Sequence, residues 1–579
     1  MALVSLSATG MWSSATPWPN GTQPTASDDV RSNGFTVYID RNVTVRSLNS
    51  NGGTFRNAGN YTVNANVSAG TSICLTLTGN GTNTFVVSGN FYGTGSTASA
   101  YALGVTGNTS TNFIYLTTIG NVFGPTVASS STIRIESGYY NHYGTSTGGT
   151  NTNSAGIEVN NSNNLPVVIF LSGGPFNAGT GNTANGFSTG LSLAGSSFSS
   201  SSITIIGTIS GGPSSPGGQT TGINNQGNIP TYITGNVYGG GAFGCYFQGS
   251  GTHNIVGNIY SGPVGGTGNV GVYNNGSTTT VNITGDVYAM ATSNNPTYGV
   301  QNGSNGIVNI VGNIYGSPAT NTGAAVYSPN NNRITITGNV SAGNVQNAYG
   351  VYLNNISYLT IYGNVTGGAA TTAYGVNNNS TGYVVISGIA QGGIGSNAHG
   401  VFNNTGGTVY VKRAKANSYG PGSAVTNIAY GAVSNTQASN TIVEELEFGA
   451  NGLIPTLGNI VLKDLPTNVV DFYTTAGGRK TLIDPNSGSI MPPVSSVRLG
   501  VSYSGDNLVG TCAMPSISSV DFGTSVDNST GIAALFTNDV WNTTNNTLTA
   551  TSLSATIGYR LINVSTTESA GQTLAAYSL

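Results

Sequence analysis

The segment ITGNVYGG, at Ile233–Gly240, returns four times further along the chain, as IVGNIYSG, ITGDVYAM, IVGNIYGS and ITGNVSAG. The glycine in its third position is Gly235, and equivalent glycines follow at intervals of 22, 28, 27, 26, 25 and 25 residues. A period of about 25 residues is typical of a solenoid, because each repeat is too short to bury a face alone and packs on its neighbours. The sequence therefore predicts one stacked array of repeats.

A second phrase alternates with the first. It reads GVYNN at Gly271–Asn275 and returns as GVQN, GVYLNN, GVNNN and GVFNN. The distance from each second phrase to the next glycine of the first phrase is 13 residues, once 14, whereas the return distance varies from 9 to 14 residues. A constant half and a variable half indicate a repeated structural unit that carries loops of different length on one side.

The repeats have the pattern of β-strands. In Val281–Thr284 and Ile334–Thr337, apolar and polar residues alternate, and the β-branched Val and Ile suit a pleated sheet. The Gly-Asn pair supplies a corner, since both residues tolerate positive φ. Two or three short strands joined by such corners form one coil, so the predicted fold is all-β, a right-handed parallel β-helix.

Asparagine recurs at the corner of each repeat. Because equivalent residues stack along a solenoid, their amides are expected to form a ladder of hydrogen bonds with a structural role. Asp286 takes the place of asparagine in one repeat and is expected to be a corner residue as well. The asparagines of this ladder are Asn236, Asn258, Asn313, Asn339 and Asn364.

The composition argues against several classes of protein. Only 5% of the 579 residues are charged and the net charge is −3, so there is no basic surface for nucleic acid. The N-terminal MALVSLSATGMWSS lacks the features of a secretory signal, and no stretch of about 18 apolar residues predicts membrane insertion. Cys74, Cys245 and Cys512 lie far apart, so neither disulfides nor a metal site is expected, and no cofactor is predicted.

Segments near both ends carry a family resemblance. WPNGTQPTASDDVRSNGFTVYIDRNVTVRSL, at Trp18–Leu48, resembles the opening of β-helix proteins of tailed-phage virions and related bacterial surface proteins. VRLGVSYSGDNLVGTCAMP, followed by NDVWN and IGYRL, resembles segments near the ends of phage tail-fibre and tail-associated proteins. The resemblance implies a tail fibre or tailspike, typically a homotrimer, that contacts other virion proteins and a host-surface glycan or protein. Its expected location is the surface of the virion, after synthesis in the host cytoplasm.

The chain is predicted to have four parts. Residues 1–34 form an N-terminal cap or a virion-docking segment, and residues 35–439 form the β-helix. Residues 440–485 form a terminal cap, on whose edge Glu444, Glu445 and Glu447 are expected to prevent end-to-end pairing. Residues 486–579 form a connector and a small C-terminal β/helical assembly region. Its weak helical pattern consists of Ile557, Leu561 and Val564.

Carboxylates are rare in the repeats. Between residues 41 and 443 the only ones are Glu136, Glu158 and Asp286. Glycoside hydrolysis usually needs two carboxyl groups within about 5 to 10 Å. Glu136 precedes one corner-like glycine and Glu158 follows a glycine of the second phrase, so they are expected on different sides of a coil. No catalytic residue is therefore predicted, although an active site between subunits stays open.

Aromatic residues recur on the outer side of the predicted coils. Tyr238, Tyr260, Tyr288 and Tyr315 are expected to form an exposed column with rings about 5 Å apart. Such a column could bind sugars, or it could be covered by another subunit or by a loop. A second, interrupted column is predicted at the second phrase, and His399 is expected to stack in its neighbourhood rather than act as a base. This second column comprises Tyr273, Tyr327, Tyr352 and Phe402.

Three functions remain open on these grounds. The first is a virion appendage that attaches to the host surface. The second is a β-helix enzyme that degrades polysaccharide, and the third is a bacterial surface adhesin.

Overall fold

The computed structural model describes most of residues 2–415 and, beyond them, short strands alone. Within 2–415 the residues not described are 79–81, 95–100, 107–112, 126–130, 150–154, 162–164, 178–188, 196–200, 212–220, 242, 263–268, 291–296, 318–322, 344–347, 356, 369–372, 394–397 and 405–406. The chain divides into two compact units, of which the first comprises residues 1–463 and 473–478.

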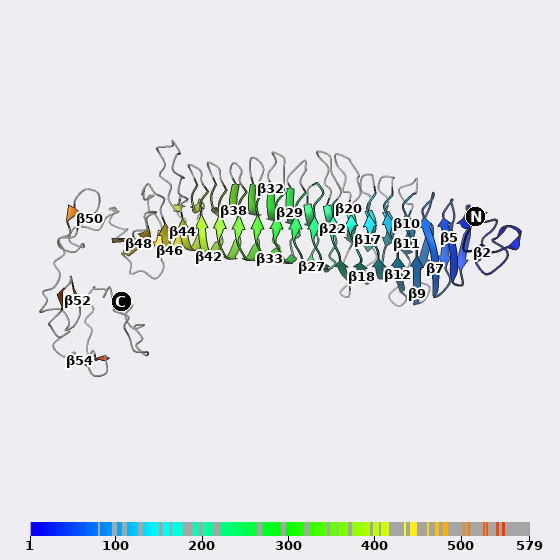
Figure 1. The fold of residues 1–579 in the computed structure, drawn as a ribbon, viewed down its shortest axis with the longest axis horizontal. Coiled ribbons are helices and arrows are strands. Elements are labelled where there is room, and N and C mark those ends of the chain that lie inside the picture. Colours follow the sequence, from blue (N-terminus) through cyan, green and yellow to red (C-terminus); the bar gives the residue numbers. More distant parts are fainter. Residues whose placement is uncertain are drawn as a thin grey trace. The chain divides into compact units, whose positions relative to one another are not determined.

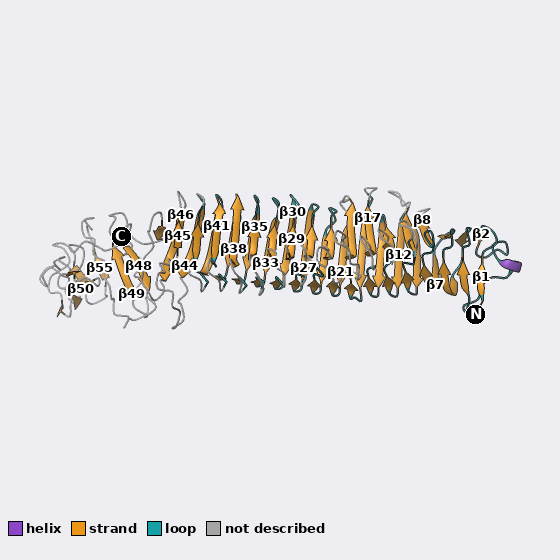
Figure 2. Ribbon diagram, turned by 90° about the horizontal axis from the view of Figure 1, so that it is seen from above, coloured by secondary structure: helices purple, strands orange, loops and turns teal. Residues whose placement is uncertain are grey.

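The first unit is a parallel β-solenoid, which confirms the predicted all-β fold (Figure 1). Its regular part has about 12 turns, and each turn contributes one strand to each of three parallel ladders. The one helical segment in the described part of the chain is a 3-10 turn, η1 (Pro19–Gly21) (Figure 2). The right-handed sense of the coil stays a prediction.

Ladder A contains the long strands that end in the first sequence phrase. Each of them pairs in parallel with its equivalent in the next turn. The strands are β5 (Val43–Asn49), β7 (Tyr61–Ser68), β9 (Asn83–Ser88), β12 (Ile114–Ile119), β15 (Gly138–Tyr143), β18 (Val167–Ser172), β21 (Ser202–Ile206), β24 (Thr231–Thr234), β27 (Gly251–Val256), β30 (Thr279–Thr284), β33 (Ile307–Val311), β36 (Arg333–Thr337), β39 (Tyr358–Tyr362), β42 (Tyr383–Gln391) and β44 (Thr408–Lys415).

Ladder B contains two-residue strands that follow the Gly-Asn corner. They are β10 (Phe91–Tyr92), β13 (Val122–Phe123), β16 (Ser146–Thr147), β19 (Phe176–Asn177), β22 (Ile209–Ser210), β25 (Val237–Tyr238), β28 (Ile259–Tyr260), β31 (Val287–Tyr288), β34 (Ile314–Tyr315), β37 (Val340–Ser341) and β40 (Val365–Thr366).

Ladder C contains the strands of the second sequence phrase and of its less regular forerunners. They are β4 (Thr36–Ile39), β6 (Thr54–Asn57), β8 (Leu75–Thr78), β11 (Leu103–Thr106), β14 (Ser131–Ile135), β17 (Ala155–Asn161), β20 (Thr189–Gly195), β23 (Thr221–Asn225), β26 (Phe243–Phe247), β29 (Asn269–Asn274), β32 (Thr297–Asn302), β35 (Gly323–Ser328), β38 (Ala348–Asn355), β41 (Val376–Ser380), β43 (Val401–Asn403) and β45 (Val433–Asn435).

The core runs through the interior of the coil. In one turn, Val281 and Ile283 of β30 and Val287 of β31 are buried, while the residues between them face outward. The residues of the next turn, Val308 and Ile310, lie in register with the first two. Burying a Val or Ile side chain contributes about 1.5–3 kcal/mol, so the stack of turns supplies the core that no single turn could form.

Glycine is required at the corner for two reasons. Gly235, Gly257 and Gly285 have φ of +144°, +149° and +148°, which L side chains rarely adopt. A Cβ on Gly257 would also lie 2.2 Å from the carbonyl oxygen of Gly235, and one on Gly285 would lie 2.2 Å from that of Gly257. The column of glycines therefore lets successive turns approach closely at this corner.

Asparagine side chains connect the turns beside these glycines. The Oδ1 atom of Asn236 accepts from the backbone N–H of Asn258 at 2.9 Å, and Asn258 Oδ1 accepts from the N–H of Asp286 at 2.9 Å. Asp286 Oδ1 continues the series to the N–H of Asn313 at 2.7 Å, and Asn313 Oδ1 to Asn339 at 2.9 Å. The predicted ladder is confirmed, with each amide bonded to the main chain of the next turn.

The N-terminal residues add strands to the solenoid. β1 (Leu3–Ser5) pairs with β3 (Asp29–Arg31), which pairs with β5, while β2 (Gly10–Met11) pairs with β4. The rings of Trp12 and Trp18 meet edge to face at 4.7 Å, and Trp12 packs against Phe55 at 6.3 Å. These two tryptophans thus extend the hydrophobic core at this end.

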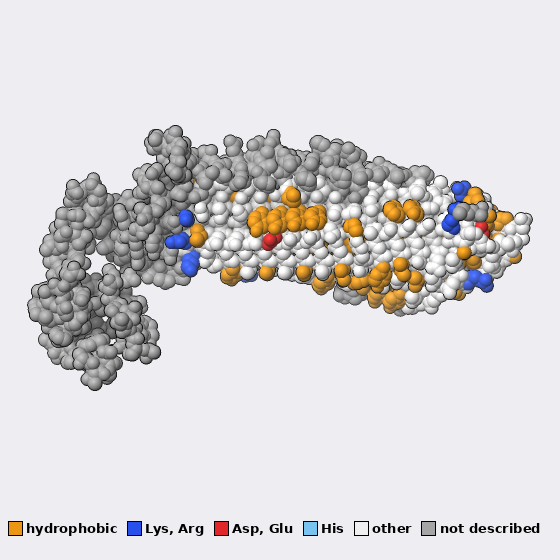
Figure 3. Space-filling view, viewed as in Figure 1, with side chains coloured by type: hydrophobic (Ala, Val, Ile, Leu, Met, Phe, Trp, Pro, Cys, Tyr) orange, Lys and Arg blue, Asp and Glu red, His pale blue; other side chains and the backbone are white. Residues whose placement is uncertain are grey.

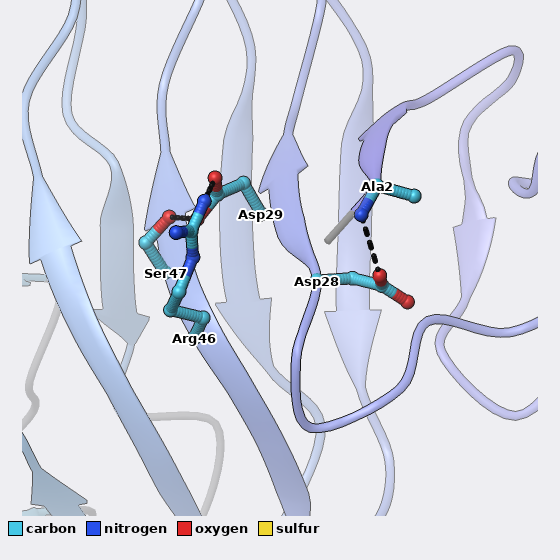
Figure 4. Close-up of polar contacts among 5 residues, drawn as sticks. All are labelled: Ala2, Asp28, Asp29, Arg46 and Ser47. Atoms are coloured by element: carbon cyan, nitrogen blue, oxygen red, sulfur yellow. Dashed lines mark hydrogen bonds and ion pairs between the residues drawn. The ribbon is translucent and has the colours of Figure 1, made fainter.

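Two aspartates fasten these first strands (Figure 4). Asp28 accepts hydrogen bonds from the backbone N–H of Thr25 and of Ala2, at 2.8 and 3.1 Å, and these bonds lower the pKa of Asp28. Asp29 pairs with Arg46 and accepts from the Ser47 hydroxyl at 2.5 Å.

At the other end, the expectation of a free acidic edge is wrong. β46 (Asn440–Glu447) pairs with β44 on one side and with β47 (Ile460–Leu462) on the other. Glu445 and Glu447 lie in register with Arg413 and Lys415 of β44.

The second unit is described only in part. It contains short antiparallel pairs, and the helix predicted at 557–564 lies outside the described residues. The pairs are β50 (Ser502–Tyr503) with β51 (Leu508–Val509), β52 (Ser525–Val526) with β53 (Ser529–Thr530), and β54 (Val540–Asn542) with β55 (Thr547–Thr549).

Replacing a corner glycine tests the close approach of the turns. Gly285→Ala is expected to lower the free energy of unfolding by more than about 2 kcal/mol, because a strained φ is joined by overlap with the preceding turn. Thermal unfolding followed by circular dichroism measures the change, with Thr284→Ala on the exposed neighbour as the control. Equal melting temperatures of the two variants would contradict this account of the corner.

Candidate functional site

The predicted tyrosine column is present on ladder B. The ring centroids of Tyr238, Tyr260, Tyr288 and Tyr315 follow one another at 4.7, 4.8 and 4.8 Å, with interplanar angles of 5°, 6° and 10°. The two end rings are 37% exposed. In the space-filling view, hydrophobic side chains form a band at mid-length of the solenoid (Figure 3).

The stacking decides what this column can offer to a ligand. Each inner ring is sandwiched between its neighbours, so Tyr260 and Tyr288 present their edges and hydroxyl groups rather than their faces. Sugars pack on ring faces, and only the outer faces of Tyr238 and Tyr315 remain, beside the small residues Ser210 and Ser341. The column is therefore a narrow apolar ridge with a row of hydroxyl groups.

One carboxylate touches this ridge. The Tyr288 hydroxyl donates to Asp286 Oδ2 at 3.2 Å, while Asp286 Oδ1 holds the corner of the next turn. Desolvation within the stack and the Asp286 carboxylate raise the pKa of Tyr288 to about 12, so this hydroxyl stays protonated at neutral pH. As predicted, Asp286 serves as a corner residue.

A charged cluster of Tyr101, Arg134, Glu136 and Glu158 lies on the outer side of ladder C. Arg134 of β14 is in register with Glu158 of β17, and its Nε atom lies 3.5 Å from Glu136 Oε1. The Arg134 guanidinium donates to the Tyr101 hydroxyl and lies 5.3 Å from the centroid of that ring. The expectation that Glu136 and Glu158 lie on different sides of a coil is thus wrong, because both flank one arginine.

Both carboxylates of the charged cluster are held as acceptors. Glu158 accepts from the Ser131 hydroxyl at 2.6 Å and from the Asn160 amide at 3.5 Å, and Glu136 forms the ion pair with Arg134. Both carboxylates are therefore held in place by neighbouring polar side chains.

Two histidines lie in the core rather than in a site. His142 Nδ1 is 2.8 Å from the Thr118 hydroxyl, and the His253 ring stacks on Phe247 at 4.3 Å. Both side chains are fully buried, and burial lowers the pKa of each to about 4. His399 stacks on Tyr374 at 5.4 Å, which confirms its predicted role.

Two of the cysteines are also inaccessible. Cys74 and Cys245 are free, buried thiols, and burial raises the pKa of both. Cys512 lies outside the described residues.

The second aromatic column is wider than the sequence suggested. Tyr327 and Tyr352 stack at 5.3 Å as predicted, and Gln301 interrupts the column after Tyr273. A parallel lane of rings precedes the Gly-Val of the second phrase, and the recurrence of an aromatic residue or histidine before that glycine could have revealed it. The members of this lane are Phe243, Tyr298, Tyr349, Tyr374 and His399.

Within the described residues, no group of three or more His, Cys, Asp or Glu side chains could hold a metal ion. A search of the same residues finds no helix that is long and apolar enough to cross a membrane. No protein-family model matches the chain, and comparison with curated proteins and with solved structures found no match.

The buried histidines predict acid sensitivity. Since the folded pKa of about 4 lies below the ordinary value of 6.5, stability is full above pH 6.5 and falls as the pH is lowered towards 4. The loss is on the order of 3 kcal/mol for each histidine.

His253→Phe, which keeps an aromatic ring against Phe247, is expected to flatten the pH dependence of the unfolding midpoint between pH 6.5 and 4. The exposed neighbour Thr252→Ala serves as the control and keeps the wild-type profile. A His253→Phe profile as steep as that of the wild type would show that this histidine is not buried in its neutral form.

Proposed function

We propose that the chain is an appendage of a tailed-bacteriophage virion, of the tail-fibre or tailspike type, that attaches the particle to the host surface. The resemblance of Trp18–Leu48 and Val497–Pro515 to phage proteins supports this assignment. On this proposal the protein is a homotrimer at the virion surface that binds other virion proteins and a host glycan or protein.

The observation that carries the proposal is the regular, almost uncharged solenoid. Its turns are fixed by close glycine corners and hydrogen-bonded ladders, which suits a stiff spacer between a particle and a surface. The side chains of His142, His253, Cys74 and Cys245 are buried, so these four groups are withdrawn from solvent.

Within this proposal the tyrosine column is a subunit contact. Its inner ring faces are already occupied by neighbouring rings, which disfavours sugar stacking, and its apolar edges suit burial against another copy. Tyr260→Ser combined with Tyr288→Ser is therefore expected to shift the protein from trimer to monomer.

Sedimentation velocity measures that shift, and Tyr358→Ser combined with Tyr383→Ser, on exposed tyrosines of ladder A, is the matched control. A stable trimer with the first pair replaced would remove the column from the interface.

One observation supports a polysaccharide-degrading enzyme as the second candidate: Glu136 and Glu158 of the charged cluster flank the same arginine. A polysaccharide-cleaving activity would use the two carboxylates on either side of a scissile bond. Both carboxylates already contact neighbouring polar side chains, an arrangement that also suits a binding site.

One experiment distinguishes the three functions. The mass of the native protein is measured by light scattering, and the same sample is incubated with bacterial envelope polysaccharides and assayed for new reducing ends. A trimer that releases none is the expected result. Release of sugar would establish the enzyme, and a monomer would contradict the trimeric appendage and favour the bacterial surface adhesin.

A further inference from the structure

The charged cluster gathers most of the charge of the repeats in one place. Between residues 57 and 411 the charged residues are Arg134, Glu136, Glu158, Asp286 and Arg333, and the first three of these five form the cluster. Solvent-accessible ion pairs contribute only about 0–1 kcal/mol, and the next two turns carry Ser192 and Asn224 at the same register position. Folding therefore does not require charges here.

The side chains of the charged cluster are held in place, but their hydrogen-bonding capacity is not fully used. The Tyr101 ring and hydroxyl fix the Arg134 guanidinium. The 3.5 Å between Arg134 Nε and Glu136 is an ion-pair distance, and this Nε has no hydrogen-bond partner within the described structure. The side chains of Arg134 and Glu136 remain 25% and 21% exposed. The Nε atom itself is buried, and the exposed parts of the guanidinium and of the carboxylate stand side by side as donor and acceptor.

The positions that follow on ladder C form a floor of short polar side chains. Glu158 is in register with Ser192, Ser192 with Asn224, and Asn224 with Tyr246. Three strand spacings separate Glu158 from Tyr246, about 14 Å. Asn224 is only 5% exposed and its Oδ1 lacks a hydrogen-bond partner among the described residues. Asn224 thus places a buried acceptor without a partner beneath this part of the floor.

Aromatic rings close the far end of this floor. Tyr246 stacks on Phe243 at 5.3 Å and lies 5.2 Å from Tyr273. An elongated ligand would meet the charged cluster first, then Ser192 and the surface above the buried Asn224, and then aromatic side chains.

We propose that the charged cluster and this floor bind a neutral or amino-bearing oligosaccharide. A sugar hydroxyl can donate to a carboxylate and accept from a guanidinium at once, which matches Arg134 and Glu136. The aromatic end suits the apolar C–H face of a sugar ring. Two glutamates and one arginine give the site a net charge of −1, which disfavours phosphorylated, sulfated or uronic-acid glycans. The inference rests on the proposed attachment function and names the receptor class that this site selects.

Binding by the full-length protein tests the proposal. Isothermal titration uses neutral, amino-bearing and anionic oligosaccharides prepared from bacterial envelopes, and the wild type is expected to bind members of the first two classes. Arg134→Gln and Glu158→Gln are each expected to weaken binding at least about tenfold, since each removes a charge-assisted hydrogen bond. Arg333→Gln, which changes the other arginine of these repeats on exposed ladder A, is the matched control and keeps wild-type affinity.

A second variant guards against loss of folding. Ser192→Tyr places a ring on the floor at a register position where ladder C already carries Tyr246, so the melting temperature is expected to hold while binding is lost.

Glycan binding that survives all three substitutions would overturn the inference and leave the attachment function standing, as would binding of anionic glycans alone. Adhesion to host cells without binding of any oligosaccharide would also overturn the inference. Absence of both adhesion and glycan binding would contradict the attachment function as well.

Discussion

The close approach of successive turns at the Gly-Asn corner is the constraint on which the rest of the solenoid depends. A side chain at Gly257 would overlap the carbonyl oxygen of Gly235, and the same holds one turn on at Gly285. The side chain that follows these glycines, asparagine or Asp286, then bonds the main chain of the next turn. Together the two residues fix both the separation and the register of the turns, so the strands on either side of the corner have little freedom to slip.

A fixed register turns each outward position into a column along the solenoid. The tyrosines of ladder B stack almost parallel because their main chains are in register, and the same alignment sets Arg134 against Glu158 on ladder C. Most of the variation in repeat length falls in the return segment between ladders B and C, outside these columns. The solenoid thus separates a constant scaffold from a variable side, and the chemistry of the molecule lies where the outward columns change composition.

Much of this architecture could be predicted from the sequence, because its cause is local and repeated. The spacing of Gly235 and its equivalents predicted the length of each turn, and the alternation in Val281–Thr284 predicted its strands. The recurrence of tyrosine at positions equivalent to Tyr238 predicted the tyrosine column. The charged cluster could not be predicted in the same way. Glu136 and Glu158 belong to less regular turns, and their common neighbour Arg134 becomes apparent only when β14 and β17 are aligned. The orientation of the tyrosine rings could not be predicted either, because the spacing of these residues in the sequence does not show that neighbouring rings cover one another's faces.

The direction of the ladder hydrogen bonds has a mechanical consequence. They run along the axis of the solenoid, so a pull along that axis loads the turns in series while the three ladders share the force within each turn. Such an array yields first at its weakest junction rather than stretching evenly. The pairings of β42, where the corner lies inside one continuous strand and the register shifts between Ile386 and Ile389, differ from every junction between β9 and β39. The response of the solenoid to tension is therefore expected to differ at this turn from the response of the uniform turns.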